Sequence, residues 1–98
     1  MRVFILVRKD DDYSSLPPNA QKIFIFDTVS NNPVLSDTIN TLNLIFESAE
    51  PGDRIVFNGP SWLIAIAGYC WLNQERDCMG ILLYDNKNRT YQEHNDAY

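Results

Sequence analysis

Four short runs of apolar residues recur along the chain, and charged or turn-forming residues close each of them. An unbroken apolar run of this length, rich in β-branched and aromatic residues, is typical of a strand buried on both faces. We therefore expect buried strands at residues 3–7 (VFILV), 22–28 (KIFIFDT), 54–57 (RIVF) and 78–84 (CMGILLY).

Two longer segments have a helical pattern, and the first of them is residues 36–50 (SDTINTLNLIFESAE). Ser36 or Asp37 is expected to cap its start, and Pro51-Gly52 to end it. Spacings of three and four place the apolar side chains on one face, as in an amphipathic helix. That face consists of Ile39, Leu42, Ile45, Phe46 and Ala49.

The second helical segment, residues 60–72 (PSWLIAIAGYCWL), is apolar all round and contains no charged residue. A helix of this kind is buried on more than one side. In a domain of this size the sheet covers one face only, so the other face is expected to meet a second copy of the chain. Trp62, Ile66 and Tyr69 lie on one face, and Leu63, Ala67 and Cys70 on another. The small residues Ala65, Ala67 and Gly68 favour close helix packing.

The order of elements is strand, strand, helix, strand, helix, strand, and residues 89–94 (RTYQEH) return after a turn as an antiparallel strand. Strands joined by helices form parallel sheets. The pattern predicts an α/β fold: a small Rossmann-like domain with a mostly parallel four-stranded sheet, two helices and a C-terminal β-hairpin. Pro17-Pro18 forbids a helix between the first two strands. A β-hairpin of those two strands is therefore the alternative.

Net charge, the lengths of the apolar runs and the cysteines indicate which kinds of partner the chain is expected to bind. The 98 residues are expected to form one domain, 1–98, with a net charge of −5. Such a charge disfavours binding to long DNA or RNA, which requires many basic contacts with phosphates. No apolar run is long enough to span a membrane. Cys70 and Cys78 lie in apolar surroundings, which indicates buried thiols in a reduced, cytoplasmic protein.

Candidate site residues follow from the rule that an open parallel sheet binds ligands outside the carboxyl ends of its strands. Asp85 and Asn86 follow the fourth strand. Residues after the first three strands are the candidates that the sequence favours: Arg8, Lys9, Asp27, Thr28, Asn58, Gly59, Pro60, Ser61 and Trp62.

The turn Asn58-Gly59-Pro60-Ser61 carries the most chemistry among these candidates. Glycine allows close approach of a ligand, and proline fits the first helical position. The amides of Ser61 and Trp62 are then expected to face a phosphate at the helix N-terminus. The same turn is also an ordinary helix start that needs no ligand, so both interpretations stay open.

No metal or cofactor is expected from the residue pattern. Asp10, Asp11 and Asp12 follow one another in a loop, where acidic side chains usually face water. Two cysteines without further ligands do not make a zinc site, and neither has a histidine nearby in the sequence to activate it as a nucleophile.

The segment AEPGDRIVFNGPSWLIAIAGYCWLNQERDCMGILLYDNKNRTYQEH, residues 49–94, resembles the C-terminal half of small stand-alone CARF-type proteins. These are the CRISPR-associated Rossmann-fold ring nucleases of type III systems. The similarity lies in the Gly-Asp before a central strand, the glycine-containing turn, the apolar helix, and the strand and hairpin that follow. It covers about half of the chain.

This resemblance implies a homodimer that binds cyclic oligoadenylate second messengers, commonly the tetraadenylate, and cleaves them without metal. The ligand's ribose 2′-OH would attack the neighbouring phosphate, which leaves 2′,3′-cyclic phosphate ends. Arg8, Lys9 and Ser61 would serve in catalysis. The remaining candidates, together with Ser61, would bind the ligand. A sensor or sponge without catalysis, an adaptor that uses the apolar helix, and a hydrolase of another small phosphate are the alternatives.

Overall fold

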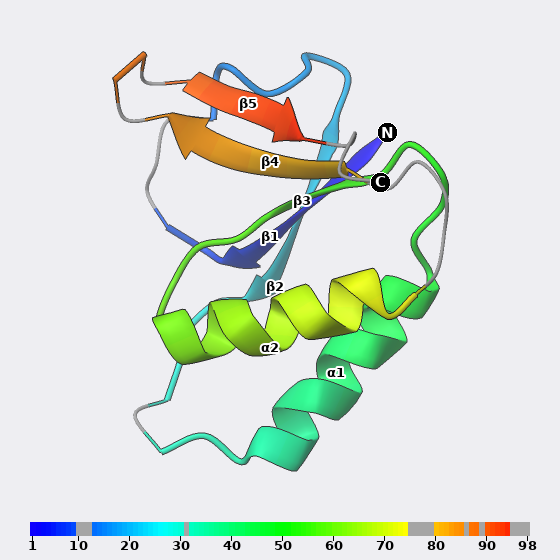
Figure 1. Ribbon diagram of the computed structural model, residues 1–98, viewed down its shortest axis with the longest axis vertical. Helices are drawn as coiled ribbons and strands as arrows, with labels where there is room; N and C mark the ends of the chain where they lie inside the picture. The colour runs from blue at the N-terminus through cyan, green and yellow to red at the C-terminus, as the bar shows by residue number, and fades with distance from the viewer. Residues whose placement is uncertain (10–12, 31, 75–79, 86, 89, 95–98) are drawn as a thin grey trace.

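The computed structural model describes residues 1–9, 13–30, 32–74, 80–85, 87–88 and 90–94. Over these ranges the chain forms five strands and two helices in the predicted order (Figure 1). They are β1 (Arg2–Val7), β2 (Gln21–Phe26), α1 (Leu35–Glu47), β3 (Arg54–Val56), α2 (Ser61–Leu72), β4 (Gly80–Asp85) and β5 (Thr90–His94).

All five strands belong to one sheet, in the order β2-β1-β3-β4-β5. β1 is parallel to both β2 and β3, and β4 is parallel to β3, so the α/β class and the mostly parallel sheet are confirmed. The alternative hairpin of the first two strands is excluded. The strand count of four is wrong, because β4 is both the last parallel strand and the antiparallel partner of β5.

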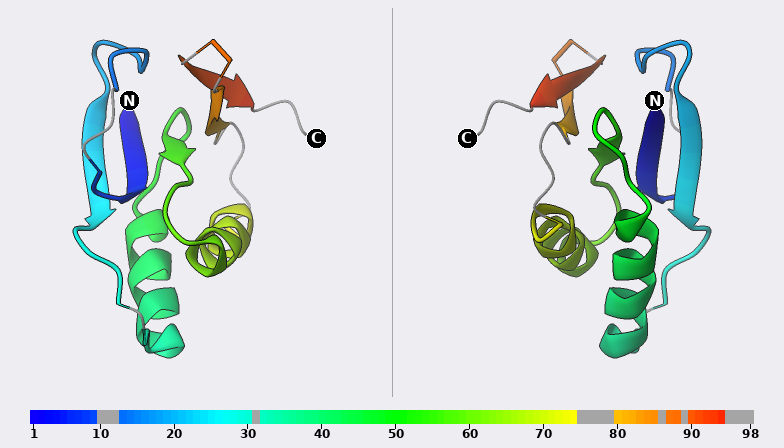
Figure 2. Two further views of the ribbon diagram at one scale, coloured as in Figure 1. Left: turned by 90° about the vertical axis from the view of Figure 1, so that its left-hand side faces the viewer. Right: turned by 90° about the vertical axis from the view of Figure 1, so that its right-hand side faces the viewer.

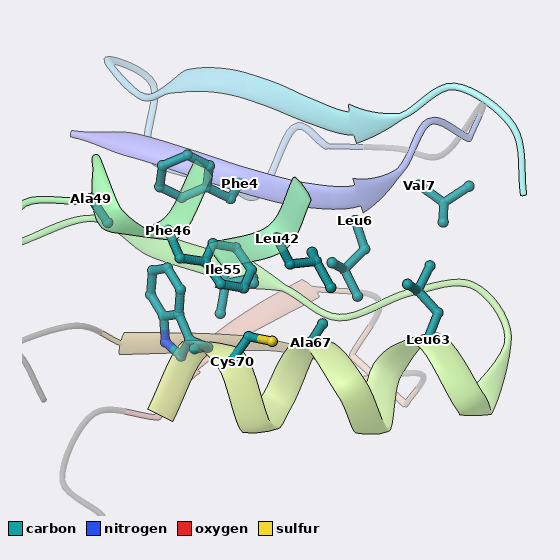
Figure 3. Close-up of a cluster of buried hydrophobic side chains, with 11 residues drawn as sticks. Phe4, Leu6, Val7, Leu42, Phe46, Ala49, Ile55, Leu63, Ala67 and Cys70 are labelled. Atoms are coloured by element: carbon teal, nitrogen blue, oxygen red, sulfur yellow. The ribbon is translucent and has the colours of Figure 1, made fainter. Parts of the chain in front are cut away.

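Both helices pack side by side on the same face of the sheet (Figure 2). The core on this face combines strand residues such as Phe4, Leu6 and Ile55 with residues of both helices (Figure 3). Phe4, Phe46 and Trp71 form its centre, with edge-to-face ring contacts and centroids 5.1–6.1 Å apart. These three aromatic side chains join β1, α1 and α2.

On the opposite face of the sheet, residues 13–20 of the connection between β1 and β2 pack against the strands, and these residues form no helix. Leu16 of that segment is buried with Val3, Ile5, Val56 and Leu82. The rings of Tyr13 and Tyr91 stack at the side of this smaller cluster, with centroids 6.1 Å apart. The prolines that exclude a helix here thus leave a loop that still buries one face of β1 and β3.

α1 begins differently from the prediction. Val34 is the N-cap residue, and no described side chain caps this end, so the expected cap at Ser36 or Asp37 is wrong. Both residues lie inside the first turn, where the Asp37 carboxylate is favoured by the helix dipole. The first helical residue is Leu35, because the chain leaves Val34 in an extended conformation.

α1 also ends at Glu47 instead of residue 50. Of the predicted apolar face, Leu42, Phe46 and Ala49 are buried and Ile45 is half-buried. Ile39 is 38% exposed, because the start of α1 extends beyond the sheet (Figure 1).

Candidate functional site

The carboxyl ends of β1 and β3 are joined by the side chain of Asn58. Its Oδ1 accepts a hydrogen bond from the backbone N–H of Val7, and its Nδ2 donates to the Val7 carbonyl, both at 2.8 Å. The amide therefore continues the ladder between the two strands after β3 has ended. Asn58, a predicted ligand residue, uses this pair of bonds to hold the turn against β1.

Gly59 has a φ of +95°, a conformation that side chains rarely adopt. A Cβ atom at this position would lie 2.7 Å from Cγ2 of Val7. The prediction attributed this glycine to the close approach of a phosphate. The fold already requires a glycine here, because the turn passes directly over the end of β1.

α2 starts one residue later than predicted. Pro60 is the N-cap residue, with a φ of −67° that suits proline and an extended ψ of 149°, so its assignment to the first helical position is wrong. Its carbonyl accepts hydrogen bonds from the amides of Leu63 and Ile64, at 3.0 and 3.1 Å. Over the described ranges, nothing accepts a hydrogen bond from the amides of Ser61 or Trp62.

A pocket of about 320 Å³ lies beside the start of α2, between the segment after β2 and the first turns of both helices. Its volume is at the lower end of the roughly 300–1,000 Å³ typical of small-molecule sites. Thr28 and Trp62, two predicted ligand residues, both line it. The loop that follows Thr28 also contributes side chains, among them Val29, Ser30 and Asn32, and so does Asp37 of α1.

Prediction missed Asp37 and residues 29–30 and 32–34 as parts of this site. The rule that ligands bind outside the carboxyl ends of strands pointed to the end of β2. However, only Asp27 and Thr28, the first two residues after this strand, were selected as candidates. The polar residues of the loop carried the usable signal. Ser30 and Asn32 lie four and six residues after the end of β2, and neither was among the predicted candidates.

Two further candidates, Arg8 and Asp27, are brought together as an ion pair. The guanidinium Nε of Arg8 lies 2.7 Å from Oδ1 of Asp27, and both side chains are largely exposed. The Arg8 guanidinium also lies over the ring of Phe24, 4.2 Å from its centroid. Arg8 is thus held along β2, while the side chain of Lys9 is exposed.

The expected buried thiol is confirmed at Cys70, on the inner face of α2. Burial raises the pKa of this thiol, which keeps it protonated and unreactive. Cys78, Asn86 and the acidic run 10–12 lie outside the described residues. Within the described ranges no group of three His, Cys, Asp or Glu residues is arranged to hold a metal ion.

The two faces of α2 differ in burial as the pattern predicted. Leu63, Ala67 and Cys70 are buried, whereas Tyr69 is 70% exposed and Trp62 and Ile66 are half-buried. Leu72 extends the outer face and is 57% exposed. Across the described residues, no helix has the length and apolar character needed to cross a membrane.

Comparison of the chain with protein-family models, with curated proteins and with solved structures gave no match.

Proposed function

We propose that this chain is a reduced, Rossmann-like domain of the CARF type that binds cyclic oligoadenylate, with cyclic tetraadenylate as the main ligand. One observation carries the proposal. Within the described residues, the amides of Ser61 and Trp62 have no acceptor, and they lie at the start of a helix whose first turn has no acidic residue. Unpaired amides at a helix N-terminus favour phosphate oxygens.

The position of these amides in the sheet supports the same proposal. β2 and β3 lie on opposite sides of β1, so the connection from β1 to β2 runs one way across the sheet, and the connections from β2 to β3 and from β3 to β4 run the other way. In doubly wound sheets of this strand order, ligands bind at the switch point between β1 and β3, outside the carboxyl ends. The turn held by Asn58 lies at this point.

A homodimer is part of the proposal, because a two-fold cyclic ligand needs two copies of the site. Each chain carries a net charge of −5, but α2 has no charged side chain. Two acidic chains therefore meet most favourably along the outer face of α2, and an isologous contact is the commonest arrangement. It would bring two copies of the turn at residues 58–61 close together.

Light scattering tests the dimer. The parent chain is expected to have twice the monomer mass at micromolar concentration, and Tyr69→Glu is expected to be a monomer with an unchanged fold. Tyr69 is 70% exposed, so this change places a charge on the outer face without disturbing the core. A parent chain that remains monomeric would remove the dimer from the proposal.

Cleavage, as proposed here, needs no metal. A ribose 2′-oxygen forms a bond to the adjacent phosphorus, and the bond from phosphorus to the 5′-oxygen breaks. The 2′-hydroxyl proton passes to solvent and the leaving 5′-oxygen takes up a proton. The amides of Ser61 and Trp62 would stabilise charge on the phosphate, with the Ser61 hydroxyl and the exposed cation of Lys9 as further donors.

A sensor or sponge that binds without cleaving is the second candidate, and the ion pair of Arg8 favours it. The guanidinium is engaged by Asp27 and lies on Phe24, so it is not directed at the start of α2 by these contacts. A domain with this arrangement can hold a phosphate through backbone amides and still lack a second positioned cation for the reaction.

The test of binding uses the amide of Ser61, the first residue of α2. Proline is well tolerated at this position of a helix, and Pro60 already has the extended ψ that a following proline requires. Ser61→Pro removes the N–H, whereas Ser61→Ala keeps the N–H and removes only the hydroxyl. We expect cyclic tetraadenylate to bind Ser61→Pro about tenfold more weakly than Ser61→Ala, as loss of a charge-assisted hydrogen bond predicts.

Calorimetry with cyclic tri-, tetra- and hexaadenylate, in EDTA, measures that affinity, and chromatography of the same mixtures detects cleavage. Equal affinity of the two variants would contradict an anion site at these amides. If the ligand binds tightly but is still intact after long incubation, the chain is a sensor or sponge and not a nuclease. Loss of cleavage with retained binding in Lys9→Ala would assign Lys9 to the reaction.

A further inference from the structure

The pocket beside α2 has a chemical character different from that of the helix N-terminus next to it. Its described lining includes the aromatic side chains of Phe26 and Trp62 and the aliphatic side chains of Val34 and Leu63. Asp37 is the one charged side chain in that described lining. A carboxylate disfavours a phosphate inside the pocket, so the occupant that fits is not an anion and is largely apolar.

The polar groups of the pocket define which occupant they can recognise. The Thr38 hydroxyl is within hydrogen-bond distance of the Val34 carbonyl, 3.2 Å away, and the Ser30 hydroxyl accepts from the Asn32 amide at 3.1 Å. Over the described ranges the Asp37 carboxylate and the Thr28 hydroxyl have no hydrogen-bond partner. Asp37 is exposed, and a carboxylate only accepts hydrogen bonds, so an occupant that contacts it is favoured when it presents an N–H or O–H donor.

We propose that this pocket holds the adenine base of a bound nucleotide, with Asp37 accepting from its exocyclic amino group. The inference rests on the proposed function, because it assigns the base of the same ligand. Trp62 connects the two parts. Its backbone amide, which has no acceptor in the described part of the chain, belongs to the proposed phosphate site, and Trp62 also lines the pocket. A base and its own phosphate can therefore be bound by neighbouring groups.

Adenosine and inosine separate this inference from phosphate binding, because neither carries a phosphate. Inosine has a carbonyl oxygen where adenosine has the amino group, so it lacks the amino donor proposed for Asp37 and carries its base N–H on the neighbouring ring nitrogen instead. We expect adenosine to bind at least tenfold more tightly than inosine. Asp37→Asn, which removes the charge at constant size, is expected to weaken adenosine binding about tenfold, in line with a hydrogen bond to a charged group. Ser36→Ala, in the same turn but outside the pocket lining, is the control.

Nuclear magnetic resonance of ¹⁵N-labelled protein provides the measurement. The chain has two tryptophans, and Trp71 is buried in the core at 1% exposure, so it serves as an internal reference. Adenosine is expected to shift the indole N–H signal of Trp62 and to leave that of Trp71 in place. Trp62→Phe assigns the signal.

The outcomes distinguish the two proposals. Equal shifts with adenosine and inosine, or unchanged adenosine affinity in Asp37→Asn, would overturn the base pocket. If cyclic tetraadenylate binds but adenosine leaves the Trp62 signal unmoved, the base lies elsewhere and the proposed function stands without this inference. If adenosine binds and cyclic tetraadenylate does not, the pocket stands and the proposed function fails.

Discussion

The two ends of the parallel sheet differ in whether their polar groups have hydrogen-bond partners within the fold. At the amino end, the residue Asp53 is 4% exposed, and its carboxylate accepts hydrogen bonds from the backbone amides of Arg2 and Glu50 and from the Arg2 guanidinium. The same guanidinium donates to the carbonyl of Ser48. At the carboxyl end, the amides of Ser61 and Trp62 find no acceptor within the described residues.

This difference in hydrogen bonding distinguishes polar groups that stabilise the fold from polar groups that can bind a ligand. Asp53 joins the start of β1 to the turn before β3, and its partners leave little capacity for another molecule. Asn58 performs the corresponding task at the carboxyl end, since both of its polar atoms bind Val7. The backbone amides of Ser61 and Trp62, on the first turn of α2, have no acceptor among the residues that the structure describes. A polar residue at a strand end therefore indicates a site only when the fold does not use it.

The largest effect is expected at the amino end. Asp53→Ala leaves two backbone amides and a guanidinium without their acceptor, and we expect it to lower the free energy of unfolding by about 3 kcal/mol. Urea unfolding followed by circular dichroism measures this change. Asp27→Ala, in the exposed pair at the other end, is the matched control and is expected to change stability by less than about 1 kcal/mol. Similar losses in both variants would remove the contrast between the two ends.

The pH dependence of stability sharpens the same contrast. Burial alone would raise the pKa of Asp53, but hydrogen bonds from the amides of Glu50 and Arg2 and the Arg2 guanidinium outweigh it and lower that pKa below 3.8. A lowered folded pKa means that the carboxylate stabilises the fold fully above the unfolded value, and that this stability is lost as pH falls through the folded value. The difference in unfolding free energy between the parent and Asp53→Asn should therefore shrink below pH 3.8. A constant difference from neutral pH down to pH 2 would contradict a lowered pKa.

Two glycines provide a matched comparison in which the expected loss of stability is intermediate. Gly52, near the amino end, and Gly59, at the carboxyl end, have φ values of +98° and +95°. A Cβ atom at Gly52 would meet nothing within 4 Å, whereas one at Gly59 would lie 2.7 Å from Val7. We expect Gly52→Ala to cost about 1 kcal/mol for the backbone conformation alone, and Gly59→Ala about 2 kcal/mol because of the added contact.

Thermal and urea unfolding of both glycine variants measure these costs. Equal destabilisation would show that the side chain of Val7 moves aside, and that the turn is free to accept a side chain. The expected inequality has a practical consequence. A substitution at Gly59 reports on folding, so a ligand site at this turn is better tested at Ser61, where the amide can be removed without disturbing the packing.

Much of the fold was predictable because its pattern is local. The apolar runs of β1 to β4 and the periodicity of α1 depend on neighbouring residues, and their order implied the parallel sheet. The site was predictable only in part. Asn58 and Arg8 were correctly located at strand ends, but their partners Val7 and Asp27 are 51 and 19 residues away in the sequence. Which polar groups the fold has already used is a property of such distant contacts.

Asp37 is a second example of a site residue that depends on contacts between distant parts of the sequence. As a helix residue it was a candidate cap, and nothing in its neighbours indicates that α2 begins across a pocket from it. The packing of α1 against α2 brings Asp37 and Trp62 to one cavity, although they are 25 positions apart. That packing depends on Phe46 and Trp71, whose contact was not predicted from the sequence.

The smallest effect on stability is expected for the Asp27–Arg8 ion pair, and variants of this pair test whether Arg8 takes part in cleavage. Asp27→Asn removes the charge that holds Arg8, and because the pair is exposed we expect the unfolding free energy to change by no more than about 0.5 kcal/mol. If Asp27 restrains a catalytic cation, release of Arg8 should raise the rate of cyclic tetraadenylate cleavage, and Arg8→Ala should lower it. If Arg8 only covers Phe24, both variants should cleave, or fail to cleave, as the parent does. Single-turnover assays in EDTA distinguish these outcomes, and the second would assign the ion pair to the surface of β2 and leave Lys9 as the cation to examine.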